Sequence, residues 1–346
     1  MRILVPLAFA LASALAAAAP VGDALDRPAL VVRAPERTVL LAAAMAGSRI
    51  VAVGERGIVA LSDDGGRTWR QADVPTSVTL TAVHFVDAKR GWAVGHGGIV
   101  LATGDGGQHW ARQLDGRQAA QIALAAAKAS GDARALADAE RLVADGPDKP
   151  MLDLLIRGDN SLLAVGAYGL ALASDDAGHT WTSWAPRLPN PKGLHIYAVR
   201  QLGDTLLMAG EQGLVMISND RGQSFRRLET PYKGSFFTAE LLGNQRIVLA
   251  GLRGNVLETT NEGSNWTLLP SPMPVSITSS IIGSDGRLLA TNQAGFVLEL
   301  QGDRLLPINA APLPPLNGLL ATGSNGLLGL GIQGVSPVPT AAGATK

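Results

Sequence analysis

The stretch Ser62-Asp63-Asp64-Gly65-Gly66-Arg67-Thr68-Trp69 decides how this chain folds, because its pattern returns further along the sequence. Written S-x-D-x-G-x-T-W, the pattern reappears unchanged at 174–181 and with substitutions at 103–110, 218–225 and 259–266. The last copy is the most altered, since Asn261 stands where the others have aspartate. Repetition at a regular spacing indicates an architecture built from similar units.

A second element precedes each copy and reads apolar-apolar-Gly-x-x-Gly-apolar-apolar. Its second glycine falls at positions 57, 98, 169, 213, 254, 295 and 334, in steps of 41, 71, 44, 41, 41 and 39 residues. Seven units of about 40 residues, each with short apolar runs, are typical of propeller blades. We therefore predict an all-β, seven-bladed β-propeller spanning 29–336.

The repeated octapeptide is an Asp-box, and we expect it to form the turn between the third and fourth strands of a blade. Its Asp or Asn can accept hydrogen bonds from backbone N–H groups of its own turn. Its glycine takes a conformation that other residues resist, and its Trp or Phe packs between neighbouring blades. The residues with this structural role are Ser62, Asp64, Gly66, Thr68, Trp69, Asp105, Gly107, Trp110, Asp176, Gly178, Trp181, Asp220, Gly222, Phe225, Asn261, Gly263 and Trp266.

The 71-residue step exceeds the others by roughly 30 residues and indicates an insertion between the second and third blades. The segments 117–129 and 132–144 are rich in alanine and have apolar residues at helical spacing. Ser130-Gly131-Asp132 breaks the run and can cap the second helix. We predict a helical hairpin over 117–145 that projects from the face opposite the Asp-boxes.

The last two blades depart from the repeat. The sixth lacks an Asp-box, and the seventh lacks an obvious fourth strand. The segment Ala29-Leu30-Val31-Val32-Arg33 is a candidate to supply that strand, which would remove an exposed sheet edge. Residues 337–346 are rich in proline and alanine, and we expect a disordered tail there.

The first 19 residues have the organisation of an export signal. Arg2 precedes an apolar stretch over 3–16, and Ala17 to Ala19 offer small residues for cleavage. No later segment is apolar for long enough to span a bilayer. We therefore predict a signal peptide over 1–19 and a periplasmic location for the mature protein.

Composition excludes several kinds of site. The chain has no cysteine, which excludes disulfides, thiolate catalysis and cysteine-bound metal. It has 29 basic and 29 acidic residues, so no strong field favours nucleic acid or anionic lipid. Its five histidines lack the spacing of metal ligands, and we expect neither a metal nor a cofactor.

We expect function on the face opposite the Asp-boxes. Strands alternate in direction within a blade, so the turns between second and third strands share a face with the blade-to-blade connections. Loops on a rigid scaffold commonly carry function, and these turns hold varied residues among repeated glycines. The predicted partner-binding face consists of Glu55, Arg56, His96, Tyr168, Glu211, Gln212, Arg253 and Gln293.

The full pattern resembles a known family. The element at 52–59 leads directly into the box at 62–69, and the pairing recurs at 93–110, 164–181 and 208–225. This arrangement is similar to the photosystem II stability/assembly factor family, which consists of exported seven-bladed propellers. The resemblance implies a non-enzymatic protein that binds a newly made membrane protein. It also implies an arginine-rich patch, for which Arg56 and Arg253 are the candidates.

Two classes of function follow. The first is a periplasmic interaction module that assists the assembly, stability or operation of a membrane protein complex. The alternative is a sialidase-type glycoside hydrolase or a carbohydrate-binding propeller, because Asp-boxes also occur in sialidases. A sialidase-type enzyme needs a Tyr–Glu nucleophile pair or two opposed carboxylates, and Glu55 and Glu211 are the candidates for such an opposed pair.

Overall fold

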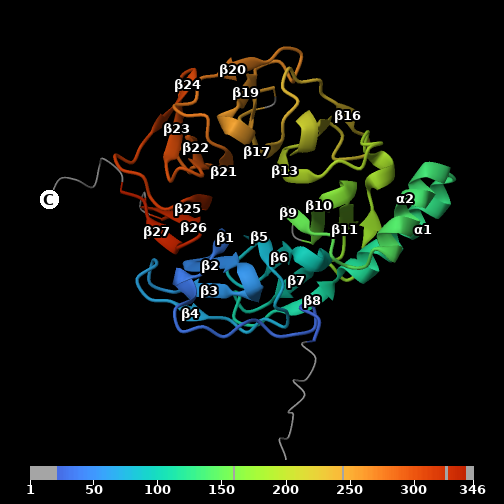
Figure 1. The fold of residues 1–346 in the computed structure, drawn as a ribbon, viewed down its shortest axis with the longest axis horizontal. Helices are drawn as coiled ribbons and strands as arrows, with labels where there is room; N and C mark the ends of the chain where they lie inside the picture. Colours follow the sequence, from blue (N-terminus) through green and yellow to red (C-terminus); the bar gives the residue numbers. More distant parts are fainter. Residues whose placement is uncertain (1–21, 159, 244, 324–325, 340–346) are drawn as a thin grey trace, which may run out of the picture.

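The computed structural model describes residues 22–158, 160–243, 245–323 and 326–339. Over these ranges the chain forms seven antiparallel sheets that follow one another around a ring (Figure 1). Each sheet is one blade, and its strands run in chain order from the middle of the ring to the rim. The prediction of a seven-bladed β-propeller is confirmed. The predicted signal peptide, 1–19, lies outside the described residues.

Blades 1 to 6 have four strands each. The strands of the first three blades are β1 (Leu40–Ala46), β2 (Arg49–Gly54), β3 (Val59–Ser62), β4 (Arg70–Gln71), β5 (Leu80–Phe85), β6 (Gly91–Gly95), β7 (Val100–Thr103), β8 (Ala111–Leu114), β9 (Met151–Arg157), β10 (Ser161–Gly166), β11 (Ala171–Ser174) and β12 (Thr182–Ser183). Those of the next three are β13 (Ile196–Leu202), β14 (Thr205–Gly210), β15 (Val215–Ser218), β16 (Arg226–Arg227), β17 (Phe236–Leu241), β18 (Ile247–Gly251), β19 (Val256–Thr259), β20 (Thr267–Leu269), β21 (Ile277–Ile282), β22 (Leu288–Asn292), β23 (Val297–Gln301) and β24 (Arg304–Pro307).

The middle strands of a blade are apolar because neighbouring blades cover both of their faces. All five residues of β6 are buried, and so are all five of β18. A sheet with one wet face would instead alternate apolar and polar residues. The innermost strands of successive blades contact one another, and β1 contacts β25 to close the ring. Apolar burial between blades is therefore the main source of stability.

The seventh blade contains three strands within the described residues: β25 (Leu316–Thr322), β26 (Gly326–Gly331) and β27 (Gly334–Pro337). The prediction that Ala29–Arg33 supplies its fourth strand is wrong. The backbone N–H of Ala29 donates to Val74 and that of Leu30 donates to Arg56, so this segment lies along blade 1.

A short 3₁₀ turn, η1 (Pro35–Arg37), lies against β27 in place of the predicted strand. A side chain at Gly334 would collide with the carbonyl oxygen of Glu36, which shows how closely the two segments approach. The chain also continues to pack after β27, since the N–H of Val338 donates to Leu327 and its side chain is buried. The predicted tail therefore begins later than residue 337, and 340–346 lie outside the described residues.

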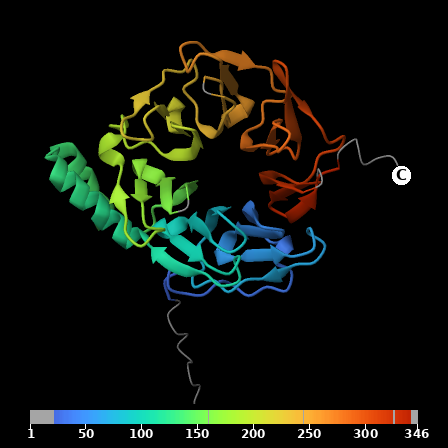
Figure 2. The same cartoon turned by 180° about the vertical axis from the view of Figure 1, so that it is seen from behind.

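The predicted helical insertion between blades 2 and 3 is confirmed as α1 (Gly116–Ser130) and α2 (Ala133–Ala144). Asp115 begins α1 with a capping box that it forms with Gln118, and Gly131 ends α1 in a left-handed conformation. Both views show the hairpin outside the ring beside blade 3 (Figures 1 and 2). α1 contacts the turn at 96–98 on the predicted face and β12 at the rim, so the hairpin begins at that face and extends outward beside blade 3.

The Asp-boxes form turns held by hydrogen bonds from within the box. In the first box, Asp64 Oδ1 accepts from the backbone N–H groups of Arg67 and Thr68 at 3.0 and 2.9 Å. The Ser62 hydroxyl accepts from the N–H of Gly66 at 2.8 Å. The indole N–H of Trp69 donates to the carbonyl oxygen of Gly66 at 3.0 Å. The hydroxyl and N–H of Thr68, with the Ser62 hydroxyl and the Arg67 N–H, hold the pKa of Asp64 far below its ordinary value.

Each box glycine lies against the preceding blade. A Cβ atom added at Gly107 would lie 3.3 Å from Val51 of blade 1, and one at Gly222 would lie 2.5 Å from Trp184 of blade 3. Both glycines have positive φ, at 86° and 85°. Glycine is thus required at this position of the box for two reasons: the turn conformation and the close packing of one blade on the next.

The Asp-boxes predict acid sensitivity. Hydrogen bonds from Thr180 and Ser174 lower the pKa of Asp176 to about 2 from its ordinary value of 3.8. A lowered carboxyl pKa stabilises the fold above the unfolded value, and this stabilisation is lost as the pH falls through the folded value. The loss in free energy of unfolding caused by Asp176→Asn should therefore shrink between pH 5 and pH 2, as measured by urea titration.

The fifth box supplies the control, because Asn261 already accepts from the Thr259 hydroxyl and the Asn265 N–H without a charge. Asn261→Asp should add pH dependence over the same window. An equal effect of Asp176→Asn at pH 5 and pH 2 would contradict the assignment.

Candidate partner-binding face

The turns between second and third strands share one geometry. In blades 1 to 5 they are the short 3₁₀ segments η2 (Glu55–Gly57), η3 (His96–Gly98), η4 (Ala167–Gly169), η6 (Glu211–Gly213) and η7 (Leu252–Gly254). Their middle residue has left-handed backbone angles, and outside blade 2 it is not glycine. These residues are Arg56, Tyr168, Gln212 and Arg253, with φ of 57°, 57°, 51° and 59°.

The conformation is costly for a residue with a Cβ, by about 1–2 kcal/mol each. The same turns have a glycine at the next position. The chain thus uses glycine there, but keeps a residue with a side chain at the middle position, where the side chain points outward. Tyr168 is 57% exposed, although it is a large aromatic residue. The chain therefore keeps side chains at these exposed turn positions despite the backbone cost.

The following glycine is required by the neighbouring connection. A Cβ at Gly213 would lie 2.6 Å from the carbonyl oxygen of Tyr232, and one at Gly254 would lie 2.6 Å from that of Met273. Tyr232 and Met273 lie in the connections that leave blades 4 and 5. The turns and the blade-to-blade connections therefore share a face, as the strand directions require.

All eight residues of the predicted partner-binding face lie at these turns or at the corresponding turn of blade 6. Few of them are brought together. Burial holds the pKa of His96 below its ordinary value, and the Glu55 carboxylate opposes this shift. Gln212 donates to Glu211 at 3.5 Å. Arg56 and Arg253 belong to blades 1 and 5, which are not neighbours in the ring, so they do not form one patch.

A row of aromatic rings runs across this face and was missed in the sequence. The rings of Tyr168 and His195 lie 5.1 Å apart, His195 and Tyr197 6.2 Å, and Tyr197 and Phe237 5.4 Å. Glu211 contacts the middle of the row, since its Oε2 accepts from the His195 backbone N–H at 3.2 Å and lies 3.0 Å from His195 Nδ1. Burial raises the pKa of Tyr197, and the Glu211 charge adds to that shift.

Two members of the row, Tyr197 and Phe237, are bulged residues, because each innermost strand has a bulge at its second residue. The bulged residues are Leu41, Thr81, Leu152, Tyr197, Phe237, Thr278 and Asn317. A bulge re-aims the side chain of the extra residue. Thr81 donates to the carbonyl oxygen of Met151 in the next blade at 2.8 Å, and Asn317 donates to that of Leu40 at 3.1 Å. The bulges thus link neighbouring blades beside the candidate face.

The chain matches the family described as photosynthesis system II assembly factor YCF48, over residues 61–143 and 141–298. It belongs to the YCF48 family. A curated relative is the photosystem II assembly lipoprotein Ycf48 of Synechococcus sp. (strain CC9902), which is 28% identical over 117 residues. That match covers 33% of this chain and 35% of the relative, so it spans about a third of each.

Solved structures of YCF48 share the fold. One described as YCF48 bound to D1 peptide has a TM-score of 0.65 and 17% identity, and covers 91% of this chain and 99% of its own. YCF48 from Cyanidioschyzon merolae has a TM-score of 0.63 and 16% identity, with coverage of 87% and 95%. The WD40 propeller domain of Doa1 has a TM-score of 0.61 at 8% identity, with coverage of 91% and 95%.

This YCF48-family chain has a buried ionic belt in the innermost strands of blades 3 to 5. Arg200 lies between two buried carboxylates, with Nη1 2.7 Å from Asp153 and Nε 3.3 Å from Glu240. Burial pushes the pKa of Asp153 upward, but the Arg200 charge together with contacts from His84 and the Val199 N–H holds the pKa below its ordinary value. Burial raises the pKa of Glu240, whose Oε1 also accepts from the Ser280 hydroxyl at 2.8 Å.

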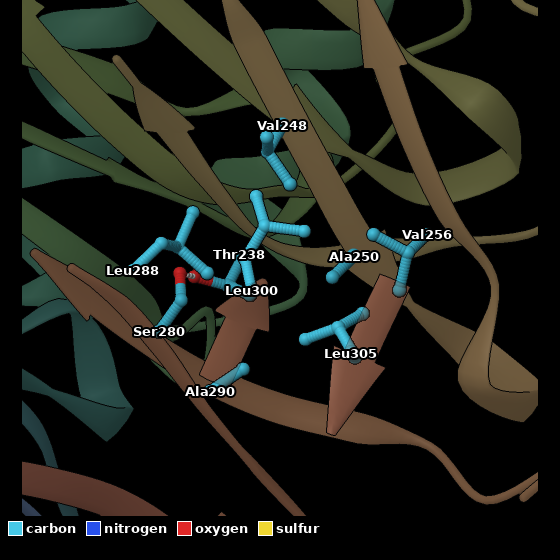
Figure 3. Close-up of a pocket in the computed structure, with 9 residues that line it drawn as sticks. All are labelled: Thr238, Val248, Ala250, Val256, Ser280, Leu288, Ala290, Leu300 and Leu305. Carbon is cyan, nitrogen blue, oxygen red and sulfur yellow. Dashed lines mark hydrogen bonds between the residues drawn. The ribbon is translucent and has the colours of Figure 1, made fainter. Parts of the chain in front are cut away.

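An enclosed cavity lies between blades 5 and 6, but it is too small for a ligand. Its volume is about 10 Å³, and apolar side chains form most of its wall (Figure 3). The hydroxyls of Thr238 and Ser280 contact each other at 2.6 Å. A volume of this size holds one water molecule at most. In the described ranges no three His, Asp or Glu side chains converge in a way that would hold a metal ion, and neither helix could cross a membrane.

The ionic belt predicts a strong mutational effect. Arg200→Met would leave the buried Asp153 and Glu240 carboxylates without the guanidinium they share, which typically costs about 3–5 kcal/mol in free energy of unfolding. The triple variant Arg200→Met, Asp153→Asn and Glu240→Gln should recover most of this loss, because it removes the unpaired charges. Urea unfolding at neutral pH measures both effects, and a single-variant loss below about 1 kcal/mol would contradict a stabilising role.

Proposed function

We propose that this chain is an exported, non-enzymatic interaction module that assists the assembly, stability or operation of a membrane protein complex. Its membership of the YCF48 family carries the proposal. The predicted signal peptide supports a periplasmic location. The partner meets the face that displays Arg56, Tyr168, Gln212 and Arg253 from strained backbone positions.

The geometry favours binding over glycoside hydrolysis. Hydrolysis with retention needs two carboxyl groups about 5–5.5 Å apart. Glu55 and Glu211 lie on blades 1 and 4, which do not adjoin, and Glu211 is already paired with His195. The Tyr232 hydroxyl donates to the carbonyl oxygen of Leu252 at 3.0 Å, so this phenol is held in a structural contact.

The partner is a peptide segment of a membrane protein. One relative of similar fold is described as bound to D1 peptide, which makes peptide recognition the natural mode for this family member as well. A face of separated arginines, a tyrosine and an aromatic row suits an extended segment, because such groups supply most of the binding energy at protein interfaces.

The strained turns allow a test that separates binding from stability. Tyr168→Gly and Arg253→Gly remove the side chain but keep a residue that tolerates positive φ, so the free energy of unfolding should change by less than about 1 kcal/mol. Recovery of the crosslinked partner from the membrane fraction of the native host should fall by about tenfold for each variant. Mass spectrometry after in-vivo crosslinking of a tagged chain measures the recovery.

Ala177→Gly is the matched control, because Ala177 has a φ of 59° on the Asp-box face. It should leave recovery unchanged. A wild-type chain that crosslinks to no membrane protein would overturn the proposal. Activity on a glycan panel that disappears in Glu55→Gln or Glu211→Gln would then favour the glycosidase alternative.

A further inference from the structure

A groove of about 830 Å³ separates the helical hairpin from the connection between blades 3 and 4. One wall is formed by α1 and α2, which present small residues at helical spacing: Ala123, Ala126, Ala127, Ala135 and Ala139. The other wall is formed by residues 185–193, which include Pro186, Leu188, Pro189 and Pro191. Alanine permits close approach of an occupant, and proline rings give a wall that loses little entropy on binding.

The groove adjoins the candidate partner-binding face at Tyr168, which lines it and also begins the aromatic row. Lys149 lies at the same end, with its Nζ 5.6 Å from the centre of the Tyr168 ring. Its side chain is only 8% exposed, and its charge is paired with Asp148. An occupant would therefore continue from the groove onto the face through an exposed tyrosine.

Some of the charges along the groove are satisfied locally. Asp132 accepts from the backbone N–H groups at the start of α2, and Asp138 pairs with Arg134 at 3.9 Å. Arg141 on α2 and Lys192 on the opposite wall have no ion-pair partner within the described ranges, and of the acids in the lining Asp132 and Asp145 have none there either. Two unpaired cations on opposing walls favour a carboxylate placed between them.

We propose that this groove binds a peptide segment of the partner that carries apolar side chains and at least one carboxylate. The apolar side chains lie between the alanines of the hairpin and the proline wall, and the carboxylate lies between Arg141 and Lys192. This inference rests on the proposed function, because it names the place and the chemical class of the peptide.

The helix itself provides a matched pair of variants. Ala135 lines the groove, whereas Ala137 is exposed on the same helix and does not line it. Ala135→Trp fills the groove, and Ala137→Trp places the same ring outside it. A phage-displayed library of random 12-residue peptides is selected on the folded wild-type chain. The wild type and Ala137→Trp should retain enriched peptides rich in apolar and acidic residues, and Ala135→Trp should lose at least about tenfold in retention.

The charge arm uses a synthetic, fluorescein-labelled copy of the most enriched peptide. The double variant Arg141→Glu and Lys192→Glu should weaken its binding by at least about tenfold, as measured by fluorescence anisotropy. Lys128→Glu is the control, since Lys128 is exposed on α1 outside the groove. Replacing the acidic residue of the peptide by lysine should restore binding to the double variant.

Three results would overturn the inference: no enrichment on the wild type, enrichment without acidic residues, or equal binding to Ala135→Trp. Crosslinking in the native host distinguishes failure of the groove inference from failure of the proposed function. If Ala135→Trp binds no peptide but still recovers the partner, the result is consistent with the proposed function. The partner then contacts a part of the chain other than the groove. Groove-dependent peptide binding without any membrane partner supports the groove and contradicts the proposed function.

Discussion

The packing of each blade on its neighbour is the constraint on which the rest of the structure depends. No blade has a face that could be left in water, since the middle strands are buried on both sides. The box glycines show how close the contact is, because a Cβ at Gly222 would lie 2.5 Å from Trp184 of the preceding blade. Once that packing is set, the turns at both ends of every blade occupy fixed positions around the ring.

This rigidity lets one face of the propeller carry strained residues. Arg56, Tyr168, Gln212 and Arg253 hold left-handed backbone angles that glycine would adopt at no steric cost. The Asp-box face has residues of the same conformation, but some of these are paired, as Glu262 is with Arg226. On the candidate face Arg56 and Arg253 have no ion-pair partner within the described residues, so their charges are available to a partner.

The Asp-boxes and the Asp153–Arg200–Glu240 belt hold their charged side chains in different ways. The Asp-box carboxylates are accessible and are held by hydroxyl and backbone donors within their own turn. The Asp153–Arg200–Glu240 belt is buried and depends on side chains from three different blades. The first arrangement is local and repeats with the sequence, whereas the second occurs once and ties blades 3 to 5 together.

The repeat predicted the number of blades, the box turns and the position of the hairpin, because each depends on residues close together in the chain. The prediction put Ala29–Arg33 in the wrong blade, because its apolar residues suit any open sheet edge. In the closed ring this segment lies along blade 1, and η1 lies against blade 7. The row from Tyr168 to Phe237 had no local signal, since it joins residues from three blades through bulges. The same holds for the groove, whose walls approach each other only after the hairpin has packed on blade 3. Local patterns thus encode turns and strands, whereas contacts between blades are decided by the closure of the whole ring.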